Sequence, residues 1–156
     1  ENYCIEAMGR FANRLGEDSQ PYSAHWGIVF GANRARTEVY TAQVNANLDY
    51  ATLRLHNYVY PGNRQPLSGE EVNVEIPLAG WTGGYHWELL ATHGNNRLRV
   101  EVHGDTVRVI INGQLRNTLY VPNLPRDRVG LIGGSWEVTP VDIMIDYFRY
   151  EPNCPE

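Results

Sequence analysis

The sequence contains no lysine, only two cysteines and no uninterrupted apolar run of about 18 residues. The absence of such a run excludes a membrane-spanning helix of the usual length. All 13 basic residues are arginines, and 18 acidic residues bring the net charge to −5. The arginines are scattered, whereas a nucleic-acid-binding protein normally has a basic excess or a basic stripe. We therefore expect no membrane insertion and no nucleic-acid partner.

Catalytic signatures are also missing. The chain has no Gly-x-Ser-x-Gly elbow, no His-Glu-x-x-His pair and no phosphate-cradling glycine loop. The five histidines stand singly in different segments: His25, His56, His86, His93 and His103. Scattered histidines are usually surface or hydrogen-bonded residues, and a metal triad assembled across strands stays open as an alternative. We expect a protein that is not an enzyme.

Alternation of apolar and polar residues with a period of two recurs along the chain, and helical periodicity is hard to find. The expected strands are 3–10, 25–31, 38–44, 51–58, 71–76, 85–92, 98–103, 106–111, 115–121, 128–133 and 141–150. About eleven short strands without a long helix predict an all-β sandwich or barrel. The length of 156 residues and the absence of a linker or repeat predict one domain over residues 1–156.

The clearest local pattern lies between Leu98 and Leu115. Apolar side chains alternate with polar ones in 98–103 and again in 106–111, so each of these strands buries one face. Gly104-Asp105 predicts a tight turn between the two strands. Asn112-Gly113 is a strong hairpin signal because both residues tolerate positive φ. Together these features predict a three-stranded antiparallel meander.

The segment from Asn96 to Gln114 resembles the concanavalin A-like lectin/glucanase superfamily, specifically the laminin-G-like jelly-roll domains of bacterial secreted and surface proteins. Val129 to Gly134 resembles the penultimate strand of that fold, and Ile145 to Tyr150 resembles the closing one. Trp26 to Phe30, followed by 38–40, fits the same pattern more loosely. The resemblance covers most of the chain from about residue 24 and implies a two-sheet antiparallel jelly-roll sandwich.

Glucanases of this superfamily carry alternating carboxylates on one strand, in a Glu-x-Asp-x-Glu run or a close variant. Such spacing gives a nucleophile and a general acid about 5 Å apart. The nearest approach here is Asp142 and Asp146, which a strand would separate by roughly 13 Å. Asp146 is expected to cap or pair at the sheet edge. An enzyme whose carboxylates come from different strands is the third-ranked alternative.

Cys4 and Cys154 stand at opposite ends of the chain without metal-ligand spacing around them. Because a jelly roll often places its first and last strands side by side, we expect a disulfide that joins the termini, with two buried free thiols as the alternative. Closing so long a loop would stabilise the fold by about 4–5 kcal/mol. A disulfide also implies an oxidising, extracellular location.

Carbohydrate is the ligand we favour, because sugar sites combine flat aromatic rings with planar polar groups. If Tyr40 and Leu53 face the core, alternation places the polar residues of both strands on the opposite, concave face. An ordinary solvated face is the alternative. The expected ligand-binding residues are Thr41, Gln43, Arg54 and His56 on strands and Tyr60, Trp81, Tyr85 and Trp136 in loops.

Two further expectations concern a metal and self-assembly. Lectin-like sandwiches often hold calcium at a loop rim, and the loop carboxylates Glu17, Asp18 and Asp49 are weak candidate ligands, solvated loop charges being the alternative.

Tyrosines, arginines and edge strands also suit contacts between copies. The chain is thus expected to be a secreted or surface-displayed, non-catalytic carbohydrate-binding module. The runner-up is the self-assembling subunit of an extracellular fibre or surface layer.

Overall fold

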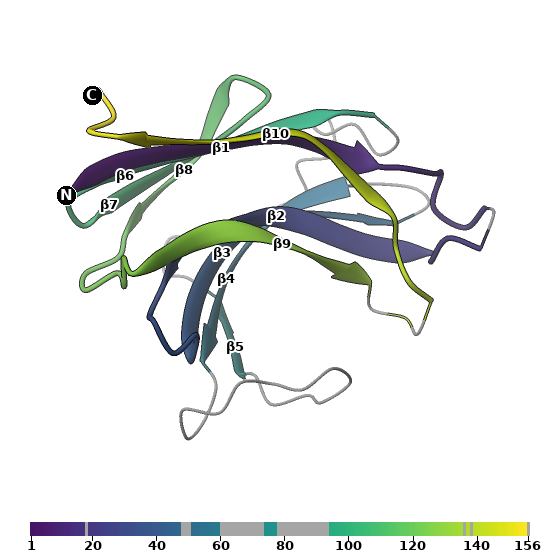
Figure 1. The fold of residues 1–156 in the computed structure, drawn as a ribbon, viewed down its shortest axis with the longest axis horizontal. Coiled ribbons are helices and arrows are strands. Elements are labelled where there is room, and N and C mark those ends of the chain that lie inside the picture. The colour runs from purple at the N-terminus through teal and green to yellow at the C-terminus, as the bar shows by residue number, and fades with distance from the viewer. Residues whose placement is uncertain are drawn as a thin grey trace.

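A computed structural model describes residues 1–17, 19–47, 51–59, 74–77, 94–135, 137 and 139–155. It has two five-stranded antiparallel sheets that lie one above the other (Figure 1). Sheet A has the order β10-β1-β6-β7-β8, and sheet B has the order β5-β4-β3-β2-β9. The strands are β1 (Asn2–Phe11), β2 (Ser23–Ala32), β3 (Glu38–Asn47), β4 (Ala51–Val59), β5 (Val74–Pro77), β6 (Asn96–His103), β7 (Thr106–Ile111), β8 (Gln114–Tyr120), β9 (Arg128–Ser135) and β10 (Ile143–Pro152).

This architecture confirms the expected all-β, two-sheet sandwich. Ten of the expected strands coincide with observed ones to within a few residues, and the expected strand 85–92 lies outside the described residues. The described part of the chain contains no helix, and hence no helix long and apolar enough to cross a membrane.

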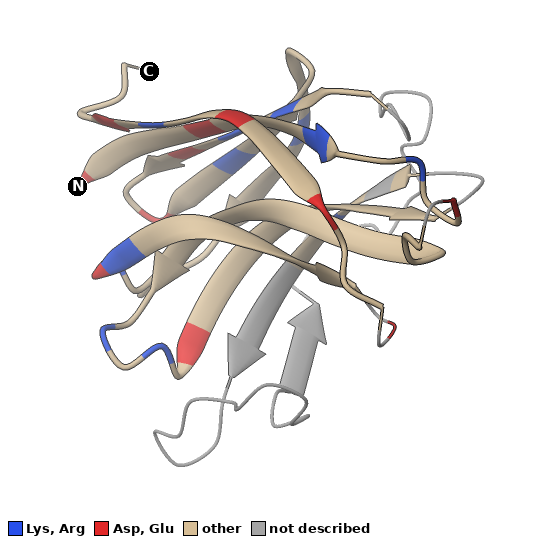
Figure 2. Cartoon of the chain, turned by 45° about the vertical axis from the view of Figure 1, so that its right-hand side comes forward, with Lys and Arg blue, Asp and Glu red and all other residues tan. Residues whose placement is uncertain are grey.

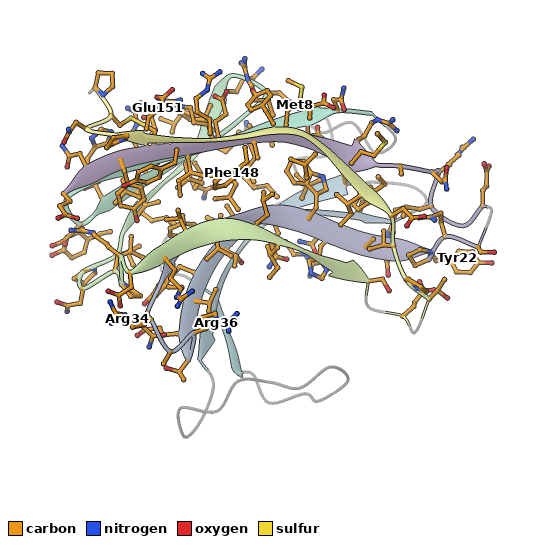
Figure 3. The ribbon with its side chains drawn as sticks, viewed as in Figure 1. Met8, Tyr22, Arg34, Arg36, Phe148 and Glu151 are labelled. Carbon is orange, nitrogen blue, oxygen red and sulfur yellow. A yellow bond between two sulfur atoms is a disulfide. The ribbon has the colours of Figure 1, made fainter. Side chains whose placement is uncertain are left out.

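The core fills the space between the sheets. It is built from the inward-facing half of each alternating strand, including Ile5 on β1, Trp26 on β2 and Leu53 on β4, all essentially inaccessible to solvent. Side-chain sticks fill this layer in Figure 3, where Met8 and Glu151 lie on the outer side of sheet A and Phe148 lies on the core side. The predicted inward faces of β3 and β4 are confirmed, because Ala42, Val44 and Leu55 are also fully buried.

The meander β6-β7-β8 forms as the sequence predicts. β6 pairs with β7 and β7 with β8, both antiparallel. Asn112 and Gly113 have φ values of 50° and 83°, so both turn residues adopt the left-handed region that this hairpin requires. Gly104 also has a positive φ, of 56°, at the preceding turn.

The two ends of the chain lie together. β1 pairs with β10 along its length, and the termini emerge on the same side of the molecule (Figure 1). Cys4 and Cys154 form a disulfide with a Cα–Cα distance of 5.3 Å, which confirms the expected pairing and excludes the free-thiol alternative. A buried hydrogen bond also links β1 to β2: the Tyr3 hydroxyl donates to the Phe30 carbonyl at 2.6 Å.

Candidate functional site

The outer face of sheet B holds an array of residues that the strand register aligns in three rows of four. We call this array the polar grid. Its first row is Gly134-His25-Asn45-Thr52, its second row is Ile132-Gly27-Gln43-Arg54 and its third row is Gly130-Val29-Thr41-His56. Residues directly opposite one another on antiparallel strands have Cβ atoms about 5 Å apart. Each row therefore brings together four positions from β9, β2, β3 and β4.

The middle of the polar grid is a hydrogen-bonded ladder along β3. Asn45 Nδ2 donates to Gln43 Oε1 at 3.4 Å, and Gln43 Nε2 donates to Thr41 Oγ1 at 2.9 Å. Each side chain in the ladder restricts the rotation of the next, so the amide groups are held in fixed orientations. The ladder thus supplies planar polar groups at set positions, as the sequence pattern of β3 predicts.

The expected exposure of this ladder is wrong. Thr41 and Gln43 are fully buried and Asn45 nearly so, whereas the alternation had suggested a solvent-facing patch. The physical reason is the place of β3 at the centre of sheet B, flanked by β2 and β4 on its two sides. Alternation distinguishes the two faces of a strand, but it does not distinguish a central strand from an edge strand.

Arg54 lies beside the ladder and is only half-buried. Its register partner is Gln43, so the structure brings these two predicted site residues together. His56 is the register partner of Thr41. The predicted aromatic residues Tyr60, Trp81, Tyr85 and Trp136 lie outside the described residues and stay predictions.

On the other side of the ladder, the polar grid has little side-chain bulk. A Cβ atom at Gly27 would lie 2.1 Å from the Ala42 carbonyl oxygen, so only glycine fits where β2 approaches β3. At Gly130 a Cβ would meet no atom within 4 Å, so the surface there is open. His25, half-buried, stands in the same row as Gly134. Gly130 therefore offers open surface to a ligand, whereas a Cβ at Gly134 would lie 3.2 Å from the His25 ring.

The shape and charge of the two outer faces differ. In Figure 1, β2 and β9 bow towards sheet A, so the outer face of sheet B is the concave one. Charged residues gather on the strands of sheet A, whereas β2 and β3 carry few (Figure 2). The only permanently charged residue of the polar grid is Arg54, and the grid contains no aspartate or glutamate.

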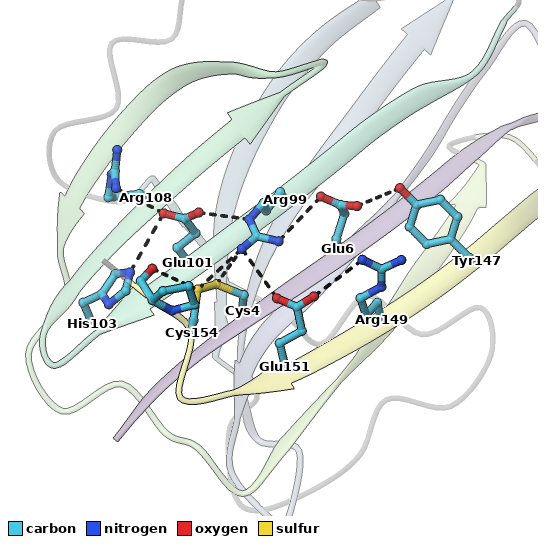
Figure 4. Close-up of polar contacts among 11 residues, drawn as sticks. Cys4, Glu6, Arg99, Glu101, His103, Arg108, Tyr147, Arg149, Glu151 and Cys154 are labelled. Carbon is cyan, nitrogen blue, oxygen red and sulfur yellow. Dashed lines mark hydrogen bonds and ion pairs between the residues drawn. A yellow bond between two sulfur atoms is a disulfide. The ribbon is translucent and has the colours of Figure 1, made fainter.

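The outer face of sheet A is instead a closed network of ion pairs (Figure 4). Arg99 lies at its centre and contacts Glu101 at 2.9 Å, Glu6 at 3.6 Å and Glu151 at 3.7 Å. Arg108 pairs with Glu101 and Arg149 with Glu151. Burial works against the charge of Arg99, but the hydrogen bond and charge of Glu101, followed by the charges of Glu151 and Glu6, raise its pKa above the ordinary value. Three guanidinium groups face three carboxylates, so the charges within this network balance one another.

The same network covers the disulfide. Arg99 Nη2 lies 3.1 Å from Cys4 Sγ and 3.5 Å from Cys154 Sγ. Among the described residues, the one cluster with metal-ligating side chains is Cys4, Glu101 and Cys154. Because the two sulfurs form a disulfide, this cluster has a structural role. We call the disulfide between the two ends of the chain the clasp.

The predicted calcium ligands are not brought together within the described residues. Glu17 is exposed and pairs with Arg14 at 3.7 Å. Asp18 and Asp49 lie outside the described residues. Calcium binding therefore stays a prediction.

Sequence reasoning missed three contributors to the polar grid: His25, Asn45 and Gly27. Asn45 continues the alternation of Thr41 and Gln43, so the pattern of β3 contained the signal for it. His25 and Gly27 join the grid only through the register of β2 with β3. No local sequence signal specifies that register.

A carbohydrate-binding module and two galectins of known structure share this fold. Carbohydrate-binding module CBM66 from Bacillus subtilis matches with a TM-score of 0.63 and 13% identity, over 97% of this chain and 75% of its own. Sheep galectin-11 matches with a TM-score of 0.53 and 10% identity, over 96% and 89%. A tetrameric galectin from the ball sponge Cinachyrella matches with a TM-score of 0.53 and 12% identity, over 97% and 92%. No protein-family model matches the sequence, and no curated protein matches it either.

These likenesses define the class of fold: the chain is a jelly-roll β-sandwich of the kind found in carbohydrate-binding modules and galectins. The three proteins are a binding module and two galectins. At identities of 10–13% the likeness concerns the fold. The narrower relationship to laminin-G-like domains stays a prediction.

Proposed function

We propose that this chain is a non-catalytic, extracellular carbohydrate-binding module whose ligand lies on the polar grid. The observation that carries the proposal is the grid itself: hydrogen-bonding groups held in fixed orientations on the concave face of a sheet, with open surface at Gly130. Sugars are recognised by planar polar groups set against flat surface, and the half-buried Arg54 and His25, which lie beside the buried ladder, offer the polar part.

The buried ladder has a supporting role in this proposal. Thr41, Gln43 and Asn45 fix the floor of the grid, and the half-buried His25 and Arg54 on either side reach the sugar hydroxyls. Tyr60, Trp81, Tyr85 and Trp136 are proposed to supply ring faces for stacking on the sugar. The disulfide supports the extracellular location, because such bonds persist in oxidising compartments.

A steric block tests the site without removing any polar group. Gly130→Phe places a ring over the third row of the grid, at a position where a Cβ has no neighbour within 4 Å. We expect the wild-type chain to bind a family of related glycans on a glycan array and Gly130→Phe to bind them at least about tenfold more weakly. That factor corresponds to about 1.4 kcal/mol of binding free energy.

Thr118→Phe is the matched control, because it adds the same ring at an exposed position on the outer face of sheet A. Equal binding by Gly130→Phe and the wild type would contradict the assignment of the site. Repeating the array with calcium and then with EDTA tests the predicted calcium requirement, since binding that survives EDTA needs no calcium.

A different observation favours the runner-up, a self-assembling structural subunit. Seven large hydrophobic side chains of the described residues are exposed, and all but Tyr22 lie on strands at sheet edges: Leu115 and Tyr120 on β8, Leu131 on β9, and Met144, Phe148 and Tyr150 on β10. Edge strands with exposed apolar side chains are templates for pairing between copies. A blank glycan array under both conditions would favour this function, and electron microscopy of concentrated protein would then be the test.

A further inference from the structure

Arg54 differs from the three arginines of the ion-pair network on sheet A, because no described carboxylate pairs with it. Arg99, Arg108 and Arg149 each contact a carboxylate at 3.7 Å or less. Within the described part of the chain, no ion pair or hydrogen bond joins Arg54 to another side chain. Among the described residues, a cluster of ion pairs thus lies on the outer face of sheet A, and Arg54 on the outer face of sheet B takes part in none.

The position of Arg54 makes this charge available to a ligand. It lies in the second row of the polar grid, opposite the buried amide of Gln43, and it is itself only half-buried. A guanidinium stays charged at any ordinary pH and presents paired N–H donors that match the two oxygens of a carboxylate or sulfate. Partial burial weakens the competition from water for those donors.

The surroundings restrict the kind of anion. The protein as a whole carries a charge of −5, so general attraction to polyanions is absent. Arg54 is the one permanent cation of the grid, so it suits one negative group of the ligand at a defined place, with neutral polar groups of the sugar around it. A nucleic acid, in contrast, needs several cations along its backbone.

From these observations we propose that the polar grid is selective for acidic carbohydrates, in which a carboxylate or sulfate on a sugar ring is bound by Arg54. This inference rests on the proposed carbohydrate-binding function and names the class of sugar. Gln43 lies next to the guanidinium in register, and the ladder that fixes Gln43 sets the floor against which the acidic sugar lies.

The test compares sugars that differ only in the negative group. Polygalacturonate, alginate and chondroitin are each offered beside their carboxyl-reduced, neutral forms, and dextran sulfate is offered beside dextran. We expect the wild-type chain to bind at least one acidic member at least about tenfold more tightly than its neutral counterpart. A preference confined to the carboxylated pairs identifies a uronic acid as the ligand, and one confined to dextran sulfate identifies a sulfated sugar.

Substitutions then assign the preference to one side chain. Arg54→Gln should abolish the difference between acidic and neutral forms, and Arg54→Lys should retain part of it, because the charge remains without the forked donors. Arg149→Gln removes the same charge from the opposite face and should leave the preference unchanged. A thermal unfolding curve for each variant shows that all are folded.

Two outcomes would overturn the inference: equal binding of acidic and neutral forms by the wild type, or a preference that persists in Arg54→Gln. In both cases sugar is still bound, so the proposed function stands and only the selectivity fails. Failure to bind any sugar here and on the glycan array would instead contradict the proposed function.

Discussion

At the scale of single residues, two tyrosines show how burial changes the chemistry of a side chain. The Tyr3 hydroxyl donates to the Phe30 carbonyl, and the Tyr40 hydroxyl donates to Glu38 Oε1 at 2.9 Å. Burial, as the largest cause, raises the pKa of each hydroxyl to about 12, and for Tyr40 the hydrogen bond to Glu38 adds to the effect. Both side chains therefore stay protonated in the folded state under conditions where an unfolded tyrosine ionises.

The raised pKa values make stability depend on alkaline pH. The unfolded pKa is about 10 and the folded pKa about 12, so the stabilisation is fully present below pH 10 and is lost as the pH rises from 10 to 12. Tyr3→Phe should lower the free energy of unfolding at pH 7 by about 1 kcal/mol, through the lost hydrogen bond, and should make the alkaline decline shallower. Urea unfolding at pH 7 and at several values between pH 10 and 12 measures both effects.

Tyr120→Phe is the control, since that side chain is 69% exposed and should leave both quantities unchanged. A Tyr3→Phe variant whose stability declined between pH 10 and 12 as steeply as that of the wild type would contradict the role given to Tyr3.

At the scale of elements, the β7-β8 hairpin depends on backbone conformation more than on contacts. Gly113 has a φ of 83°, and the nearest atom to a Cβ at this position would be the flexible end of the Arg97 side chain, at 3.3 Å. Gly113→Ala should therefore lower the free energy of unfolding by about 1–2 kcal/mol, which is the cost of a left-handed conformation for a residue with a side chain. Chemical denaturation of the purified variant measures this loss.

Gly130→Ala provides the matched control for the turn. Gly130 lies in β9 with an ordinary strand conformation, and an added Cβ would meet no atom. The free energy of unfolding should change there by less than about 0.5 kcal/mol. Comparable losses in the two alanine variants would mean that backbone conformation is not what makes the turn require glycine.

Sequence patterns were sufficient to predict strand pairing where the paired strands are consecutive. Alternation and turn residues predicted the meander β6-β7-β8 closely, because each of its pairings joins neighbours in sequence across a short turn. The polar residues of β3 and Arg54 of β4 were likewise predicted to lie together, because β3 and β4 are consecutive. His25 and Gly27 join the grid through the register of β2 with β3. Gly130 joins it through the pairing of β9 with β2, whose partners are about a hundred positions apart, and no local pattern specifies such a pairing.

At the scale of the whole molecule, the clasp between the ends of the chain restricts the unfolded state. The disulfide joins residues that are 150 positions apart, so almost the entire chain is closed into one loop. Replacing Cys4 and Cys154 together by serine should lower the free energy of unfolding by about 4–5 kcal/mol. The shift of the urea midpoint between the variant and the wild type measures this value.

Reduction of the wild-type disulfide is the matched comparison. The reduced protein and the double variant should unfold at similar urea concentrations, because both have lost the same cross-link. If the double variant unfolded at the same midpoint as the oxidised protein, the clasp would contribute nothing to stability. The pairing of β1 with β10, observed along the length of β1, would then be sufficient to hold the termini together.

The sequence alone determined the fold class, most strand positions, the hairpin turn and the identity of the two cysteines as partners. Alternation and turn chemistry depend on residues that are close in sequence, and two cysteines allow only one disulfide within the chain. Tertiary structure decided which strand lies at the centre of sheet B, and therefore that Thr41 and Gln43 are buried while Arg54 stays accessible. It also decided that Arg99 is surrounded by carboxylates whereas Arg54 pairs with no described one, because ion pairs between distant strands depend on register and sheet order.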